Sequence, residues 1–168
     1  MLENTQNKFS WFDVSDDVKE LLILATQTWE NTQESEKYML AALAKTRENT
    51  DVLVAAYRYF YYKNNYHLAL ITAEKIIAKI RELENLPDNW EAIKPILMQY
   101  HQNPNIRLYL NAYTAYGLVL AKLGNMEKAQ EISNQIMSIT IPDTNDKNDF
   151  GAGILLQILT RTPEDDND

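Results

Sequence analysis

Apolar residues recur along most of the chain at the three- and four-residue spacing of amphipathic helices rather than in the alternation of strands. This spacing predicts a series of about eight helices. The segments that carry the pattern are 16–29, 35–48, 49–63, 66–83, 88–103, 105–124, 126–139 and 150–160. Ser15 is a candidate N-cap for the first segment, and Asp16 and Asp17 fall in its first turn, where the helix dipole favours acidic side chains.

The breaks between these segments are short and polar. Asn64 and Asn65 separate the third segment from the fourth, and Gly124 separates the sixth from the seventh. Such short connections predict antiparallel neighbours. Pro95 lies inside the fifth segment and must either kink it or begin a second short helix. With 45% apolar residues and only four Gly and five Pro, the composition also favours an all-α fold.

The helix pairs follow one another at a fixed offset. Ala42 lies 34 residues before Ile76, and Ile136 follows Ile76 by 60 residues, which is 34 plus an insertion of 26. Two-helix units of this length bury their apolar faces by stacking on their neighbours. We therefore predict one helical-repeat domain over 1–163, with units at 16–49, 50–83 and 110–143, an insertion at 84–109, and an acidic tail at 164–168.

The third unit has the most distinctive pattern of large and small residues. It consists of Tyr113, Tyr116, Gly117, Leu120, Gly124, Met126 and Ala129. This pattern resembles the tetratricopeptide repeat, a pair of antiparallel helices with small residues where the helices approach and a Gly at the turn. The resemblance implies a right-handed α-solenoid, with the segment 150–160 as a C-terminal capping helix. An ordinary helical bundle that ends in the same segment is the alternative.

The first two units match this pattern less completely. In the second unit, Leu53, Ala56, Phe60, Tyr66 and Ala69 fit, whereas Tyr57 stands at a small position and Asn64 replaces the turn Gly. In the first unit, Leu22, Met39 and Ala42 fit, but Lys19 falls where an apolar anchor is expected. The register of the first unit therefore stays open.

An aromatic run over residues 57–66 lies in the middle of the second unit. Helical spacing puts Leu53, Ala56, Tyr57 and Phe60 on the stripe that faces a partner helix, and puts Val54, Arg58, Tyr61 and Tyr62 on another side. Aromatic stripes most often serve only as core. Because Tyr61 and Tyr62 are adjacent, however, one core does not readily bury both rings, and tyrosine is well suited to interfaces.

The resemblance implies a concave groove lined by the first helix of each unit. The expected lining is Glu20, Leu24, Gln27, Val54, Arg58, Tyr61, Tyr62, Asn111, Thr114, Leu118 and Lys122. Asp17 and Glu20 give the groove an acidic end, so we expect a peptide or partner helix of basic and apolar character. Simple solvation at a helix start also explains these two acids. Members of the family that hold chaperone carboxylates use Lys and Asn where this chain has Glu20 and Leu24, so we do not expect that specialised function.

Charge and composition limit the other classes of partner. The formal charge of -8 opposes binding to a phosphate backbone, so nucleic acid is not expected. No run approaches the roughly 18 apolar residues of a membrane span, and the first residues lack a signal-peptide pattern, so we expect a cytoplasmic protein. The chain has no Cys, which excludes disulfides and thiolate zinc sites.

Catalytic and metal-binding motifs are missing from the sequence. His67 and His101 are the only histidines and lie in no metal-site spacing, and there is no phosphate-binding glycine loop or nucleophile elbow. We therefore expect no enzyme, metal or cofactor. The predicted function is a protein-interaction module, an adaptor, scaffold or chaperone similar to the bacterial secretion chaperones of comparable length and repeat count, which lack the insertion. A self-associating structural or assembly subunit, or a helical protein with a small-molecule or metal site, are the alternatives.

Overall fold

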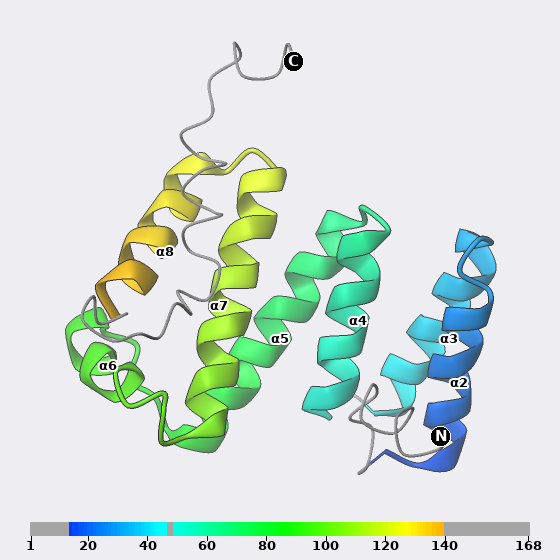
Figure 1. Cartoon of the computed structure of the whole chain (residues 1–168), viewed down its shortest axis with the longest axis horizontal. Coiled ribbons are helices and arrows are strands. Elements are labelled where there is room, and N and C mark those ends of the chain that lie inside the picture. Colours follow the sequence, from blue (N-terminus) through cyan, green and yellow to red (C-terminus); the bar gives the residue numbers. More distant parts are fainter. Residues whose placement is uncertain (1–13, 47–48, 140–168) are drawn as a thin grey trace. The chain divides into compact units, whose positions relative to one another are not determined.

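The computed structural model describes residues 14–46 and 49–139, and these form helices and no strands (Figure 1). The helices are α2 (Asp16–Gln27), α3 (Thr32–Lys45), α4 (Thr50–Tyr62), α5 (Tyr66–Glu84), α6 (Trp90–Leu97), α7 (Pro104–Lys122) and α8 (Met126–Ile139). The all-α prediction is confirmed for this part of the chain. The predicted capping helix at 150–160 and the acidic tail at 164–168 lie outside the described residues.

The observed helix boundaries agree better with local capping interactions than with the boundaries predicted from the apolar pattern. The second helix begins at Thr32 rather than Ser35, because the side chain of Asn31 accepts a hydrogen bond from the Glu34 backbone N–H at 3.2 Å. The segment 88–103 is not one helix: α6 contains Pro95 and ends at Leu97. The chain then turns before Pro104 opens α7, a position where the missing N–H costs nothing.

The chain divides into two compact units that meet within α5, between Thr72 and Ala73. The first contains α2, α3, α4 and the beginning of α5. The second contains the rest of α5 together with α6, α7 and α8.

In the first unit, α2 and α3 pack side by side. The buried residues of α2 are Val18, Leu22 and Ala25, and those of α3 include Met39 and Ala42. Fully burying one side chain the size of Leu22 contributes roughly 1.5–3 kcal/mol to folding. Leu22, Met39 and Ala42 are thus in the core, as the apolar pattern of the first helix pair predicts.

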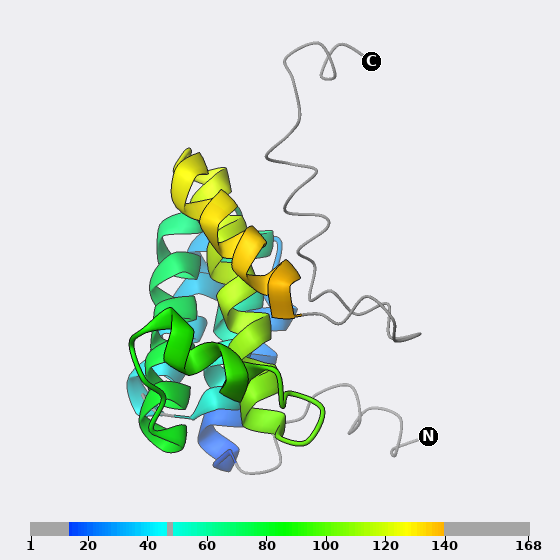
Figure 2. The ribbon, with the colours of Figure 1, turned by 90° about the vertical axis from the view of Figure 1, so that its left-hand side faces the viewer.

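In the second unit, α7 and α8 run side by side and α6 packs against α7 (Figures 1 and 2). The predicted insertion is folded, and Ile93, Leu97 and Tyr100 are buried. Arg81 of α5 fastens it by donating hydrogen bonds to the Asp88 carboxylate at 3.1 Å, the Pro87 carbonyl at 3.3 Å and the Tyr109 hydroxyl at 3.0 Å. These bonds join α5, the start of the insertion and α7 within one unit.

The turns at Asn64 and Gly124 have the same construction, although the sequence analysis treated Asn64 as a departure from the pattern. Both residues have a positive φ, 60° and 90° respectively. The next backbone N–H, of Asn65 or Asn125, donates to the carbonyl five residues earlier, of Phe60 or Leu120, at 2.8 Å in both cases. Asn is the non-glycine residue that most readily adopts this left-handed conformation, so it replaces Gly here without changing the turn.

An Asn also caps the second helix of each pair. The side-chain oxygens of Asn31, Asn65 and Asn125 accept from the backbone N–H three residues later, at 3.2, 3.3 and 3.4 Å. The second Asn follows the first by 34 residues and the third follows the second by 60, the offsets found in the apolar pattern. Four residues after each Asn comes a fully buried small residue, which is Ser35, Ala69 or Ala129. This recurring Asn lies outside the pattern of large and small residues from which the repeat was predicted.

Candidate partner-binding surface

The outward side of α4 carries the aromatic residues that the sequence analysis separated from the core. Tyr62 is 70% exposed, Arg58 is exposed, and Val54 and Tyr61 are half-buried. On the opposite stripe of the same helix, Leu53, Ala56 and Phe60 are buried, and Tyr57 is half-buried between the two sides. The predicted division of the aromatic run into a core side and a surface side is therefore present in α4.

Tyr61 is held in place by three other rings. It stacks on Tyr57 with the centroids 6.0 Å apart, and it meets Tyr62 and Tyr66 edge-to-face at 5.8 and 5.9 Å. Such aromatic pairs contribute about 0.5–1.5 kcal/mol each beyond burial. Burial, followed by Tyr66 and Tyr62, raises the pKa of Tyr61, so its phenol is neutral near pH 7. We call Arg58, Tyr61, Tyr62 and Tyr66 the tyrosine surface.

Another side of α4 attaches the helix to the turn between α2 and α3. The hydroxyls of Tyr59 and Ser35 share a buried hydrogen bond, and the Tyr59 ring meets Trp29 edge-to-face at 5.5 Å. Lys63 Nζ lies 4.1 Å from the centroid of the Trp29 ring and donates to the Trp29 carbonyl. Tyr59 is therefore a structural residue that the sequence analysis did not assign, although its spacing from Val52 and Ala56 places it on a buried stripe.

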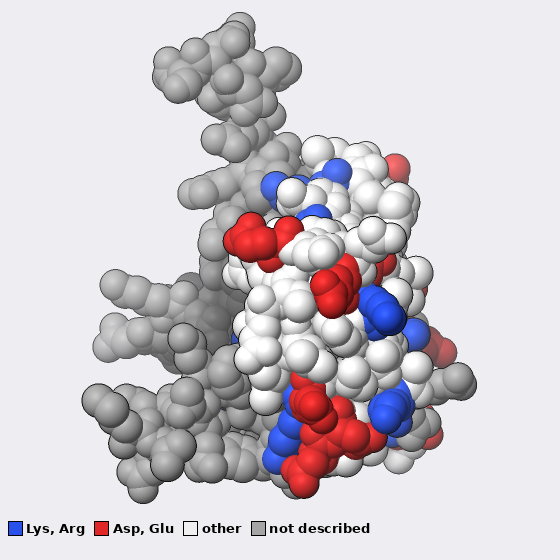
Figure 3. All heavy atoms as spheres, turned by 90° about the vertical axis from the view of Figure 1, so that its right-hand side faces the viewer, with Lys and Arg blue, Asp and Glu red and all other residues white. Residues whose placement is uncertain are grey.

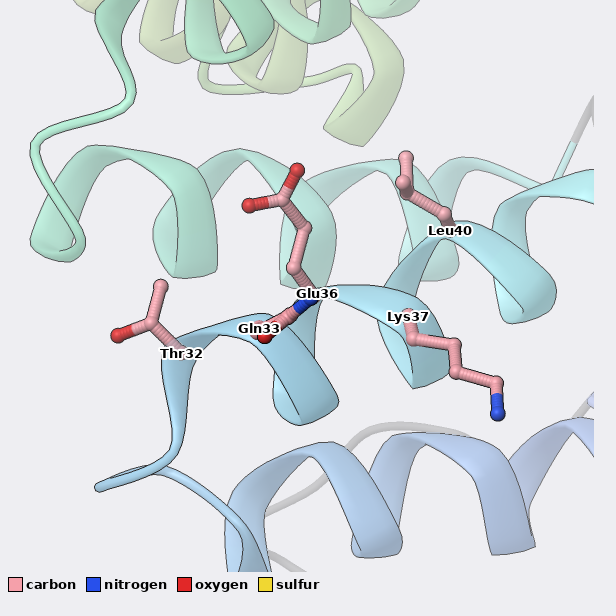
Figure 4. A pocket seen from close by; sticks show the side chains of 5 residues that line it. All are labelled: Thr32, Gln33, Glu36, Lys37 and Leu40. Atoms are coloured by element: carbon pink, nitrogen blue, oxygen red, sulfur yellow. The ribbon is translucent and has the colours of Figure 1, made fainter.

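A shallow hollow of about 570 Å³ lies on α3 (Figure 4). It is lined by Thr32, Gln33, Glu36, Lys37 and Leu40. Glu36 and Lys37 point to opposite sides of the helix, and Leu40 is 43% exposed. No sequence signal assigned these residues to a site. With one acid, one base and one exposed apolar side chain, the hollow has no clear preference for the charge of a ligand.

The predicted groove residues of α2 are on the surface or partly so. Glu20 and Gln27 are exposed and Leu24 is half-buried. The predicted acidic end is partly neutralised, because Asp17 forms an ion pair with Lys45 at 2.9 Å. Hydrogen bonds from Lys45 and Ser15 lower the pKa of Asp17 to about 2. Figure 3 shows acidic side chains gathered toward the end where α2 begins, with basic ones beside them.

The predicted groove residues of α7 belong to the second unit. Asn111 and Lys122 are exposed and Leu118 is half-buried. Thr114 is only 6% exposed, and its hydroxyl donates to the Leu110 carbonyl at 2.8 Å. The prediction that Thr114 lines a surface is wrong, because it follows Leu110 by four residues and so lies on the buried stripe of the helix.

The two histidines do not belong to a metal-binding group within the described residues. His67 and His101 are exposed, and within 14–46 and 49–139 no three His, Asp or Glu side chains gather in a metal-binding group. In the same part of the chain, none of the helices combines the length and apolar character needed to span a membrane.

Comparisons with known proteins give a similarity without a function. No family model matches the chain, and no solved structure matches it. The chain is 28% identical over 128 residues to a protein of Azotobacter chroococcum mcd 1, covering 74% of this chain and 69% of that protein. That relative is described as an uncharacterized 19.8 kDa protein in the nifW 5′ region.

Proposed function

We propose that the chain is a protein-interaction module that binds a segment of a partner protein on the tyrosine surface of α4 and α5. The observation that carries the proposal is the setting of two neighbouring rings: Tyr61 is fixed among three tyrosines, while Tyr62 beside it is 70% exposed. Tyr62 meets the Tyr61 ring edge-to-face, and a tyrosine side chain, with only two rotatable bonds before its hydroxyl, loses little entropy when a partner covers it. Interfaces are enriched in tyrosine for this reason and for its polar hydroxyl.

We further propose that the three helix pairs are copies of one unit that resembles the tetratricopeptide repeat. The support is the recurrence of the Asn caps at residues 31, 65 and 125, and of the left-handed turn at Asn64 and Gly124. A fixed period of this length is typical of repeat proteins, which function mainly by binding other proteins. This second proposal gives the fold, and the first gives the activity.

Site-specific photo-crosslinking in the native host tests the proposed function. A photoreactive amino acid replaces Tyr62, and matched probes replace Lys37 in the hollow of α3 and Gln130, an exposed residue of α8. The proposal expects a discrete crosslinked partner at Tyr62 that the Gln130 probe does not give. The partner is then purified, and its affinity for the parent is compared with its affinity for Tyr62→Ala.

Other crosslinking results separate the alternatives. A partner captured only by the Lys37 probe assigns binding to the hollow and contradicts the proposal. A crosslink to a second copy of the chain at Tyr62 supports the self-associating subunit instead. Because the Azotobacter relative is described by its place in the nifW 5′ region, the product of nifW is one defined protein to test directly.

A further inference from the structure

We infer that the tyrosine surface takes an acidic partner segment, in which carboxylates flank an apolar or aromatic side chain. The inference rests on the proposed function and specifies the chemistry of the partner. An acidic partner differs from the basic partner that the sequence predicts. The prediction of a basic partner came from Asp17 and Glu20 of α2. Asp17 is already paired with Lys45, and α4 presents the opposite charge.

The first observation is the charge of the segment that forms the surface. The chain has 24 acidic residues in 168, yet there is no Asp or Glu between Asp51 and Glu74. The same stretch contains Arg58, Lys63 and His67. The tyrosine surface is therefore locally basic in a chain whose formal charge is -8.

The second observation concerns which of these cations is available to a partner. Lys63 is engaged, since it lies over the Trp29 ring and donates to the Trp29 carbonyl. Arg58 is exposed and forms no ion pair with any residue of the described ranges. It precedes Tyr61 by three residues and Tyr62 by four, so its guanidinium shares their side of the helix. Arginine binds carboxylates through two parallel hydrogen bonds.

The third observation concerns the side chains that pack around the tyrosines of α4. Burial raises the pKa of Tyr59, the hydrogen bond with Ser35 lowers it, and Glu36 of α3 raises it further. Tyr61 contacts the rings of Tyr57, Tyr62 and Tyr66, and burial, followed by Tyr66 and Tyr62, raises its pKa. Arg58 and the rings beside it therefore combine a free positive charge with aromatic contact area.

An acidic polypeptide fits this surface better than a nucleic acid does. Nucleic-acid binding depends on several clustered Lys and Arg that neutralise successive phosphates. The tyrosine surface offers one Arg that forms no ion pair with a described residue, within a chain of net negative charge. One guanidinium beside two or three rings matches a short segment with one or two carboxylates next to an apolar anchor.

Selection from a random dodecapeptide library on the full chain tests the inference, with subtraction of peptides that also bind Tyr62→Ala. The expected peptides are enriched in Asp and Glu beside Trp, Phe, Tyr or Leu. Binding of a synthetic peptide from this set, measured by fluorescence anisotropy, should weaken about tenfold or more in Arg58→Glu, the effect of losing a charge-assisted hydrogen bond. Arg107→Glu is the matched control, because Arg107 is exposed in the other unit and its reversal changes the net charge equally.

Four results overturn the inference. Enrichment of Lys and Arg in peptides that need Tyr62 contradicts the acidic partner but leaves the tyrosine surface as the binding site. Equal weakening by Arg58→Glu and Arg107→Glu shows that binding depends on long-range charge rather than on local recognition by Arg58. If acidic peptides do not bind but a single-stranded oligonucleotide binds and needs Arg58, the partner belongs to another class. If no peptide distinguishes the parent from Tyr62→Ala, the proposed function itself fails together with the inference.

Discussion

Replacing Gly124 by Ala isolates the cost of the left-handed turn between α7 and α8. Gly124 has a φ of 90°, and a Cβ added at this residue meets nothing within 4 Å. Steric overlap with neighbouring side chains therefore contributes nothing, and the cost is that of the backbone conformation, about 1–2 kcal/mol for a residue with a Cβ. For a chain of this size, that loss lowers the melting temperature by about 2–8 °C.

Thermal unfolding followed by circular dichroism measures this loss, and two further variants serve as controls. Gly124→Asn should recover most of the stability, because Asn tolerates the left-handed conformation and occupies the same place at Asn64. Asn64→Gly should be neutral or slightly stabilising for the same reason. If Gly124→Ala melts at the temperature of the parent, or if Gly124→Asn is as unstable as Gly124→Ala, the reasoning about this turn is wrong.

Three more predictions concern the core, the insertion and alkaline pH. Phe60→Ala should cost about 3–5 kcal/mol as a buried aromatic, measured by urea unfolding, and a loss under 1 kcal/mol would contradict its place in the core. Arg81→Ala should speed protease cleavage within 84–109, because three hydrogen bonds that fasten the insertion are lost, whereas Arg107→Ala should not. Burial raises the pKa of Tyr113 above its ordinary value of 10.0, so the stability it contributes is present below pH 10 and is lost as the pH rises further. The melting temperature should therefore fall above pH 10, and less steeply in Tyr113→Phe.

Most helices of the described residues were predictable from the sequence because they depend on local patterns. Apolar spacing located α4 and α5, and the polar pair Asn64 and Asn65 located the turn between them. The extent of α6 was not predictable in the same way. Pro95 allowed either a kink or a new helix, and the early end at Leu97 depends on how Ile93, Leu97 and Tyr100 are buried in the second unit.

The candidate site was predictable only in part, because helical spacing gives the side of a helix but not what packs beside it. It placed Arg58 and Tyr62 on the outward side of α4 correctly. It did not indicate that Tyr61 would pack against three other rings, since one of these, Tyr66, lies beyond the turn. It also placed Thr114 on a surface, where the stripe of α7 is in fact buried.

The ring contacts of Tyr61 mean that replacing both Tyr61 and Tyr62 would affect stability as well as binding. Alanine at both Tyr61 and Tyr62 removes three ring pairs around Tyr61, so the double variant should lose about 1.5–4.5 kcal/mol of stability as well as any binding. Tyr62→Ala is the cleaner test, because this side chain is 70% exposed. Tyr38→Ala is its control, a tyrosine of α3 in the same unit that bonds to Glu34 and lies outside the tyrosine surface.

The central claim is that one side of α4 binds a partner and the opposite side packs into the core. Titration calorimetry with the partner captured at Tyr62, on the parent, Tyr62→Ala and Tyr38→Ala, tests it most directly. The account predicts that Tyr62→Ala melts within a few degrees of the parent and binds about tenfold or more weakly, as loss of an interface anchor does, while Tyr38→Ala binds like the parent. Unchanged affinity in a folded Tyr62→Ala protein, or a fall in affinity only as large as that of Tyr38→Ala, would contradict it.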